Sequence, residues 1–151
     1  MAIKEFQKDY RWLSNFSDCE VVLDGLTYRS VEYAYQAAKT LIVSERAHII
    51  AAGYAGEAKR RGKLVTKRPD WEQVKLQVME GLLLQKFPQK YFKDKLLATG
   101  DQELIEGNYY HDVFYGVCNG KCRKGPHTPF GDNHLGKLIM KIRDELRRGV
   151  K

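Results

Sequence analysis

Glu32 is the residue whose surroundings best suit acid–base chemistry. It falls in the first turn of an expected helix, between Val31 and Tyr33, with Tyr35 one turn further on. A carboxyl group among aromatic side chains can have a shifted proton affinity, so it can act as a general acid or base. The alternative is an ordinary acid that the helix dipole favours at an N-terminus.

Asp112 is a second acid in a suggestive position. It lies in the segment 107–131, which holds five glycines and two prolines and has no sustained apolar period. A loop this long inside a compact domain is uncommon and is often functional. The alternative is that Asp112 is a simple turn residue.

The segment Gly131–Lys137 matches the first seven positions of a phosphate-binding P-loop. The eighth position should be Ser or Thr to hold magnesium, but it is Leu138, and no buried strand precedes the motif. We therefore exclude a nucleotide-hydrolysing P-loop. A glycine-rich start of a helix remains, where free N–H groups could bind an anion.

Cys118 and Cys122, together with His127 and His134, suggest a zinc site. The C-x3-C spacing is wider than the usual C-x2-C, and the intervals to the histidines fit no familiar zinc motif. Free cysteines in a glycine-rich loop are the better interpretation, so we expect no metal.

Basic residues are concentrated in Lys59–Arg68, which holds six of them and no acid. Such a run can contact phosphate on a nucleotide or on nucleic acid. The alternative is a solvated helix end and loop.

Local signals predict the elements that carry these residues. Asp24-Gly25 predicts a type I′ hairpin between 21–23 and 26–28. Ser30 is the expected N-cap of a helix over 31–42, whose apolar stripe includes Ile42. Further helices are expected after a Ser44 cap up to Gly53, over 56–61, over 70–87 with a face of Trp71, Val74, Val78 and Leu82, over 89–98, and over 135–146.

Composition places the chain among ordinary globular proteins. It has 151 residues, 43% of them hydrophobic, and a formal charge of +7. That length suits one domain, no apolar run is long enough for a membrane span, and the charged N-terminus does not resemble a signal peptide. Three cysteines do not make a disulfide framework, so we expect a cytoplasmic location.

Ordered sequence blocks between residues 12 and 146 resemble the YbiA-type NADAR family. The blocks are Leu13–Phe16, Ser30–Lys39, Ala58–Gly62, Arg68–Lys75, Leu96–Gly100, Asp112-x-x-Tyr115-Gly116 and Gly131–Gly136. The resemblance implies an α+β fold: one mostly helical domain over residues 1–151, with a small β-sheet or hairpin.

The resemblance also implies an N-glycosidase that needs no cofactor or metal and breaks the bond between ribose C1′ and an exocyclic amine. The implied substrates are ADP-ribosylated guanine in nucleic acid, or the ribosylamine phosphates of riboflavin synthesis. The expected partners are thus a phosphorylated ribosyl or ADP-ribosyl substrate and, for the first class, the nucleic acid that carries the adduct. No membrane partner is expected.

Site residues follow from the same resemblance. Glu32 matches the catalytic glutamate of the family, and Asp112 matches the acid of its D-x-x-W-G motif. Lys39 is our candidate for a Schiff-base route, because exocyclic amine glycosides can open to an imine. The residues expected to bind substrate are Asn15, Phe16, Tyr35, Lys59, Arg60, Tyr115, Gly116 and Asn133.

Two departures leave alternatives open. Tyr115 stands where the family usually has Trp, and Lys63 stands where Arg is common. The first favours an alternative function, a non-catalytic module that binds ADP-ribose or a related nucleotide. A basic nucleic-acid-binding protein is a third possibility, and its affinity would fall steeply with salt.

Overall fold

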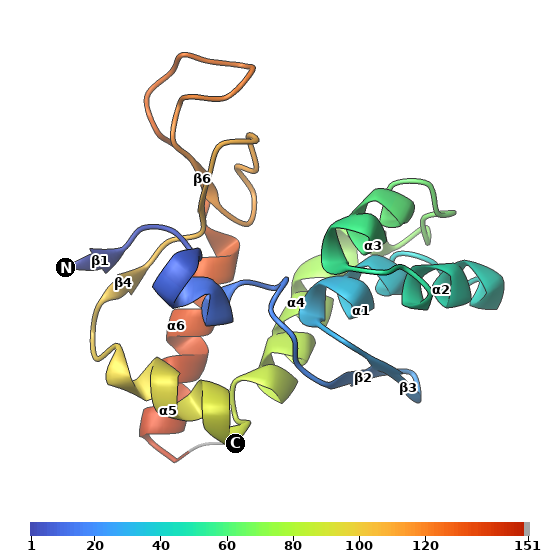
Figure 1. The fold of residues 1–151 in the computed structure, drawn as a ribbon, viewed down its shortest axis with the longest axis horizontal. Coiled ribbons are helices and arrows are strands. Elements are labelled where there is room, and N and C mark those ends of the chain that lie inside the picture. The colour runs from blue at the N-terminus through green and yellow to red at the C-terminus, as the bar shows by residue number, and fades with distance from the viewer. Residues whose placement is uncertain (150–151) are drawn as a thin grey trace. The chain divides into compact units, whose positions relative to one another are not determined.

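The computed structural model describes residues 1–149 and shows an α+β fold (Figure 1). The elements are β1 (Ala2–Ile3), the 3-10 helix η1 (Lys8–Leu13), β2 (Val21–Leu23), β3 (Leu26–Tyr28), α1 (Val31–Ala38), α2 (Val43–Ile50), α3 (Ala55–Gly62), α4 (Trp71–Lys86), α5 (Lys90–Ala98), β4 (Glu103–Leu104), β5 (Gly107–Asn108), β6 (Val117–Cys118) and α6 (His134–Arg147). Within this range, no helix is both long enough and apolar enough to cross a membrane.

The chain forms two compact units. Unit 1 contains Met1–Ser14 and the chain from Phe87 onward, and unit 2 contains Asn15–Lys86. Glu32 therefore belongs to unit 2 and Asp112 to unit 1. That both units act as one domain stays a prediction.

The hairpin of unit 2 is confirmed in its predicted register. β2 and β3 pair antiparallel, with Leu23 opposite Leu26. Asp24 and Gly25 have φ values of 50° and 82°, which a type I′ turn requires at both central positions.

Helix α1 forms the centre of unit 2. All eight of its residues are buried, and it packs against α2, α3, α4 and the hairpin. Ser30 is its N-cap, as predicted, and its side chain accepts a hydrogen bond from the backbone N–H of Tyr33. A helix that is covered on all sides can hold a charged side chain away from water.

The predicted end of this helix is wrong. α1 stops at Ala38, and Ile42 is 43% exposed and caps α2 instead of joining the apolar stripe. Ser44 is therefore not the N-cap of the second helix, because it lies inside α2. Buried Arg46 stabilises the break, since its Nε donates to the carbonyls of Ala37 and Thr40.

Helix α4 ends before Pro88, as the sequence predicts. Trp71 and Leu82 of the predicted face are buried, whereas Val74 and Val78 are only half-buried. The buried face turns toward Met79 instead.

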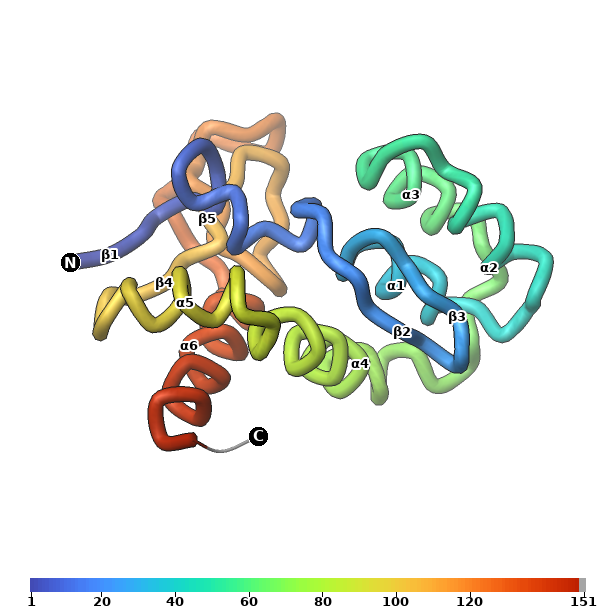
Figure 2. The backbone as a smooth tube through the Cα atoms, turned by 60° about the horizontal axis from the view of Figure 1, so that its bottom comes forward, coloured from blue at the N-terminus to red at the C-terminus, as the bar shows by residue number. Residues whose placement is uncertain are grey.

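In unit 1, β1 and β4 form a parallel pair that brings the N-terminal segment beside residues 103–104 (Figure 2). Helix α6 packs against α5 and β4. Gly136 permits this packing, because a Cβ there would overlap the carbonyl oxygen of Leu104.

The glycine-rich segment is mostly irregular, as predicted, but it is not without pairing. β5 and β6 are parallel and place Asn108 opposite Cys118. A further bridge joins Cys118 to Phe130. These contacts bring the two ends of segment 107–131 together.

Candidate active site

Glu32 and Gln36 form the centre of the site in unit 2. Glu32 is 7% exposed, and Nε2 of Gln36 donates a hydrogen bond of 2.6 Å to its Oε2. The backbone N–H of Glu32 donates to the carbonyl of Asn15 at 3.0 Å, which holds residue 15 beside the start of α1. A buried carboxylate in a fixed orientation is the group that acid–base or electrostatic catalysis needs.

Asn15 and Gln36 each have a buried amide oxygen. Within residues 1–149, neither Oδ1 of Asn15 nor Oε1 of Gln36 has a hydrogen-bond partner. The amide of Asn15 contacts Met79 through Nδ2, 3.6 Å from the sulfur. Oε1 of Gln36 packs against Gly62, whereas Oδ1 of Asn15 suits a donor group of a ligand, because buried polar atoms are nearly always paired.

Lys39 is the C-cap residue directly after α1, with helical backbone angles, and it follows Glu32 by seven residues, so the two residues lie on the same side of the helix. Burial lowers the pKa of Lys39, and the nearby Glu32 carboxylate raises it. The positive charges of Lys67, Lys59 and Lys63 lower it further, so the pKa lies below its ordinary value. The amine is therefore closer to its neutral, nucleophilic form than a surface lysine is.

Aromatic side chains accompany these groups. The Tyr35 ring packs edge-to-face on Trp71 with centroids 5.1 Å apart, and Nζ of Lys39 lies 5.8 Å from the Tyr35 centroid. Phe16 lies under Lys59, whose Nζ is 6.0 Å from the ring centroid. The structure thus groups the predicted residues Asn15, Phe16, Glu32, Tyr35, Lys39 and Lys59 around one helix.

Arg60 has a different environment. Its guanidinium donates to the Tyr54 hydroxyl at 2.6 Å and stacks on the Tyr54 ring, and both residues are exposed. Its contacts therefore place it on the outer side of α3, and its role in binding phosphate stays a prediction.

In unit 1, Asp112 organises a tight turn. Its Oδ1 accepts hydrogen bonds from the backbone N–H groups of Phe114 and Tyr115, at 3.2 and 3.0 Å. Buried Asn108 fixes the residue from the other side, because its Nδ2 donates to the Asp112 carbonyl and its Oδ1 accepts from the Asp112 N–H. The Asp112 carboxylate thus fixes the backbone of Tyr115.

Gly116 and Asn133 have structural roles in packing against residues 104–106. A Cβ on Gly116 would overlap the carbonyl oxygen of Glu106, so only glycine fits there. The Asn133 amide bridges two backbone groups: it donates to the carbonyl of Leu104 and accepts from the N–H of Glu106. A role for either residue in binding substrate stays a prediction.

The expectation of free N–H groups at the start of the last helix is wrong. The N–H groups of residues 132, 134 and 135 donate to the carbonyls of residues 113, 114 and 115, at 2.8, 3.1 and 3.0 Å, and the N–H of Asn133 donates to the carbonyl of Gly116 at 3.3 Å. Because the Asp112 turn already occupies these donors, they are not available to an anion.

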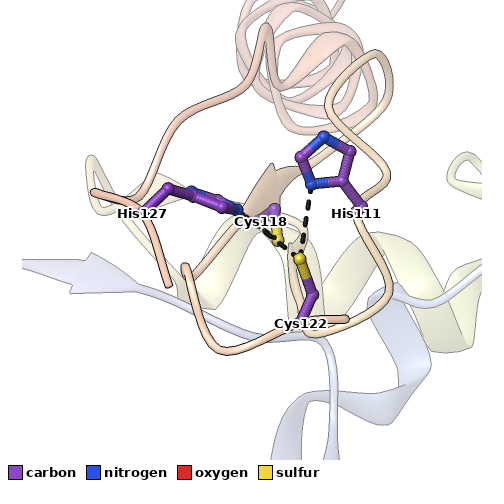
Figure 3. A group of neighbouring side chains, drawn as sticks. All are labelled: His111, Cys118, Cys122 and His127. Carbon is purple, nitrogen blue, oxygen red and sulfur yellow. Dashed lines mark hydrogen bonds between the residues drawn. The ribbon is translucent and has the colours of Figure 1, made fainter. Parts of the chain in front are cut away.

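Four potential metal ligands converge in segment 107–131 (Figure 3). They are His111, Cys118, Cys122 and His127. Three of the four residues that suggested a zinc site in the sequence belong to this cluster, and its fourth member is His111 and not His134. Burial raises the pKa of Cys122, but hydrogen bonds from His127, the Lys124 backbone, Cys118 and His111 outweigh it and lower the pKa to about 6.

Three residues of these sites were not predicted from the sequence: Gln36, Asn108 and His111. Gln36 lies four residues after Glu32, a spacing that predicts a contact on a helix, so it could have been found. Asn108 and His111 gave no local signal, because their contacts depend on the pairing of β5 with β6.

Comparisons with known proteins connect this arrangement to a family. The NADAR domain profile matches residues 3–147. The chain is 37% identical over 145 residues to N-glycosidase Npun_R5314 of Nostoc punctiforme, covering 91% of this chain and 86% of that protein. It is 35% identical over 141 residues to N-glycosidase YbiA of Escherichia coli, covering 91% of this chain and 82% of that protein.

A longer relative and a solved structure agree with this result. Riboflavin biosynthesis protein VVA0006 of Vibrio vulnificus is 31% identical over 146 residues, which cover 95% of this chain but only 37% of that protein. The NMR structure of E. coli YbiA matches with a TM-score of 0.78 at 31% identity, covering 99% of this chain and 85% of that one. These relatives support a glycosidase-type enzyme, and the chain belongs to the NADAR domain family, with a YbiA-type fold.

Proposed function

We propose that this protein hydrolyses the N-glycosidic bond between C1′ of a phosphorylated ribose or ADP-ribose and an exocyclic amine. The observation that carries the proposal is the buried Glu32 carboxylate, oriented by Gln36 and sharing a helix face with Lys39, whose pKa is lowered. The names of the Nostoc and E. coli relatives support an N-glycosidase.

In the direct route, Glu32 acts on the sugar. Breaking the C1′–N bond leaves positive charge on C1′ and the ring oxygen, which a nearby carboxylate stabilises. The oxygen of a water molecule then bonds to C1′, and the proton that the water loses is taken up by the carboxylate. The departing amine takes up a proton from solvent, and the carboxylate later releases to solvent the proton that it took from the attacking water, so water is divided between the two products.

Lys39 offers a second route. An exocyclic amine glycoside can open to an imine at C1′, and the neutral Nζ of Lys39 can add to that carbon. The exocyclic amine then leaves, and water hydrolyses the imine between Lys39 and the sugar. The lowered pKa of Lys39 favours this route, because a protonated amine cannot attack.

The charges near Lys39 suit a phosphorylated substrate. Lys59, Lys63 and Lys67 all lie close enough to Lys39 to lower its pKa. Such a group of cations can bind the phosphate of ribose 5-phosphate or the diphosphate of ADP-ribose. We propose Asp112 as the second catalytic carboxylate, because it matches the acid of the family motif.

Product analysis by mass spectrometry tests the proposal. The purified protein is incubated with a pyrimidine ribosylamine 5-phosphate and, separately, with an oligonucleotide that carries ADP-ribosyl guanine. We expect release of ribose 5-phosphate from the first or of ADP-ribose from the second, and the result identifies the substrate class. If neither substrate is cleaved, the proposal is wrong.

Glu32→Gln is the critical variant. Its amide oxygen can still accept the hydrogen bond from Gln36, so we expect normal folding and a loss of kcat/KM of about a thousandfold. Glu72→Gln is the matched control, because Glu72 is an exposed acid of the same unit, paired with Lys75 on the surface. Retention of activity within about tenfold in Glu32→Gln would exclude Glu32 as the essential carboxylate.

A binding module for ADP-ribose is the second candidate. Tyr115, which replaces the usual Trp of the family motif, is the observation that favours it. This function predicts that ligand is retained unchanged, with equal affinity in wild type and in Glu32→Gln, whereas a hydrolase consumes it.

A further inference from the structure

The cluster of His111, Cys118, Cys122 and His127 offers four soft ligand atoms that all lie within 4.8 Å of one another. In Figure 3 the four side chains point toward a common centre. None of the three cysteines of the chain is in a disulfide, so both sulfurs of the cluster are thiols. Two thiols with two imidazoles are a ligand set that selects zinc.

Three sulfur–nitrogen distances in the cluster fit a metal-centred tetrahedron. Zn–S bonds of about 2.3 Å and Zn–N bonds of about 2.0 Å place neighbouring sulfur and nitrogen ligands about 3.5 Å apart. Nε2 of His127 lies 3.6 Å from Sγ of Cys118 and 3.5 Å from Sγ of Cys122. Nδ1 of His111 lies 3.4 Å from Sγ of Cys122.

Groups that surround the cluster orient its ligand side chains. Nδ1 of His127 lies 2.7 Å from the carbonyl oxygen of Thr128, so it carries the proton and leaves the Nε2 lone pair directed at the sulfurs. The backbone N–H of Lys124 donates to the Cys122 sulfur. The Phe130 ring packs against both imidazoles, with centroids 5.6 Å from His111 and 5.1 Å from His127.

The backbone is shaped to bring the ligands together. Gly120 has φ of 91°, and a Cβ there would overlap the carbonyl oxygen of His127, so the chain can approach this closely only at glycine. His111 has φ of 65°, a conformation that costs energy in a residue with a side chain. A metal bond to His111 would offset that cost.

The segment has little regular structure, and several of its large side chains are exposed. Its strands β5 and β6 have two residues each, and Tyr109, Tyr110 and Phe130 are about half exposed. A segment with so little buried apolar surface is the kind that a structural metal holds in place.

We propose that His111, Cys118, Cys122 and His127 bind one structural Zn²⁺ ion, which fixes segment 107–131 of unit 1. His111 directly precedes Asp112, so the ion would also hold the turn that carries Tyr115. This site is separate from the N-glycosidase proposal, because its chemistry is structural and its readouts do not use activity.

The test measures zinc in the full chain, purified under reducing conditions. Elemental analysis is expected to give one zinc ion per chain, and X-ray absorption at the zinc edge should show two sulfur and two nitrogen neighbours. Cobalt added to the chelator-treated protein should give the intense visible bands of a tetrahedral ion and a thiolate-to-cobalt charge-transfer band. Removal of zinc should speed hydrogen exchange across 108–131.

Variants identify the ligands. His111→Asn and Cys122→Ser should weaken zinc binding by about a hundredfold or more. Cys19→Ser and His134→Asn are the matched controls and should leave it unchanged; the latter separates His111 from the histidine that sequence spacing suggested. If a ligand variant does not fold, absorption spectroscopy of the wild-type protein still decides.

Three results would overturn the proposal. One is reduced wild-type protein that binds no zinc even when the metal is added. Another is a scattering shell of oxygen neighbours alone. The last is a Cys118–Cys122 disulfide in the freshly isolated protein, which would point to a redox pair in place of a metal site.

Discussion

Gln36 donates a hydrogen bond of 2.6 Å to Oε2 of Glu32, one turn earlier on α1. Both side chains are buried, so this bond fixes the carboxylate in an environment with little water. Gly62 of α3 lies behind Gln36, and its missing side chain leaves the space that the amide occupies. The position of the Glu32 carboxylate therefore depends on two residues that do no chemistry themselves.

Replacing Gln36 by Leu should impair both stability and catalysis. The change removes a donor from a buried carboxylate, so the free energy of unfolding should fall by about 1–3 kcal/mol in urea denaturation. A misplaced carboxylate should lower kcat by about a hundredfold with a smaller effect on KM. An unchanged kcat in a folded Gln36→Leu protein would show that this bond does not position Glu32.

Gly62→Ala tests the same arrangement from the other side. The new methyl group would overlap the Gln36 amide, whose Cδ lies only 2.7 Å from the Cβ position, so the free energy of unfolding should fall by about 1–3 kcal/mol. We expect kcat to fall with it. Gly81→Ala in α4 is the control: nothing lies within 4 Å of its Cβ position, and the helix should gain about 0.5–1 kcal/mol. Equal effects of the two substitutions would contradict this account.

The lowered pKa of Lys39 should make the stability of the protein depend on pH. Its pKa is lowered in the folded protein, so between that pKa and the ordinary value of 10.5 the unfolded chain binds more protons and stability rises with pH. Below this window, burying the charged amine costs free energy. Lys39→Met should thus raise the Tm by up to about 4 °C at neutral pH, and the gain should shrink as the pH approaches 10.5.

The same variant should be inactive if Lys39 is the nucleophile, and Lys39→Arg should be inactive too, because arginine stays protonated. Reduction with borohydride during turnover should then link the sugar to Lys39 in the wild-type protein alone. Lys4→Met, at an exposed lysine, controls for the loss of charge and should leave the Tm and its pH dependence unchanged. Full activity in Lys39→Met would leave only direct attack by water.

Two substitutions of Asp112 can distinguish its role in forming the turn from the role of its negative charge. Asparagine keeps an oxygen that can accept from the N–H groups of Phe114 and Tyr115, whereas alanine does not. If the charge matters, Asp112→Asn should lower kcat about a hundredfold while its Tm stays near wild type, and Asp112→Ala should also lose about 1–2 kcal/mol of stability. Wild-type kcat in Asp112→Asn would reduce the residue to a turn former.

Local chemistry in the sequence determined a good part of the fold. Asp24-Gly25 sets the hairpin turn, Ser30 starts α1, and Pro88 follows the end of α4, because each acts on the backbone within a few residues. Helical spacing alone also places Glu32 and Lys39 on one face. The family and its fold follow from ordered motifs, which hold without knowledge of the tertiary contacts.

Contacts between distant residues decided the rest. α1 ends at Ala38 and not at Ile42 because Arg46 binds the carbonyls of Ala37 and Thr40, a bond that no local pattern predicts. The donors at the start of α6 are occupied because residues 113–116 return to them. His111 joins the cysteines, and His134 does not, because parallel pairing places Asn108 opposite Cys118. Pairing of this kind depends on chain closure over many residues, and sequence spacing alone does not determine it.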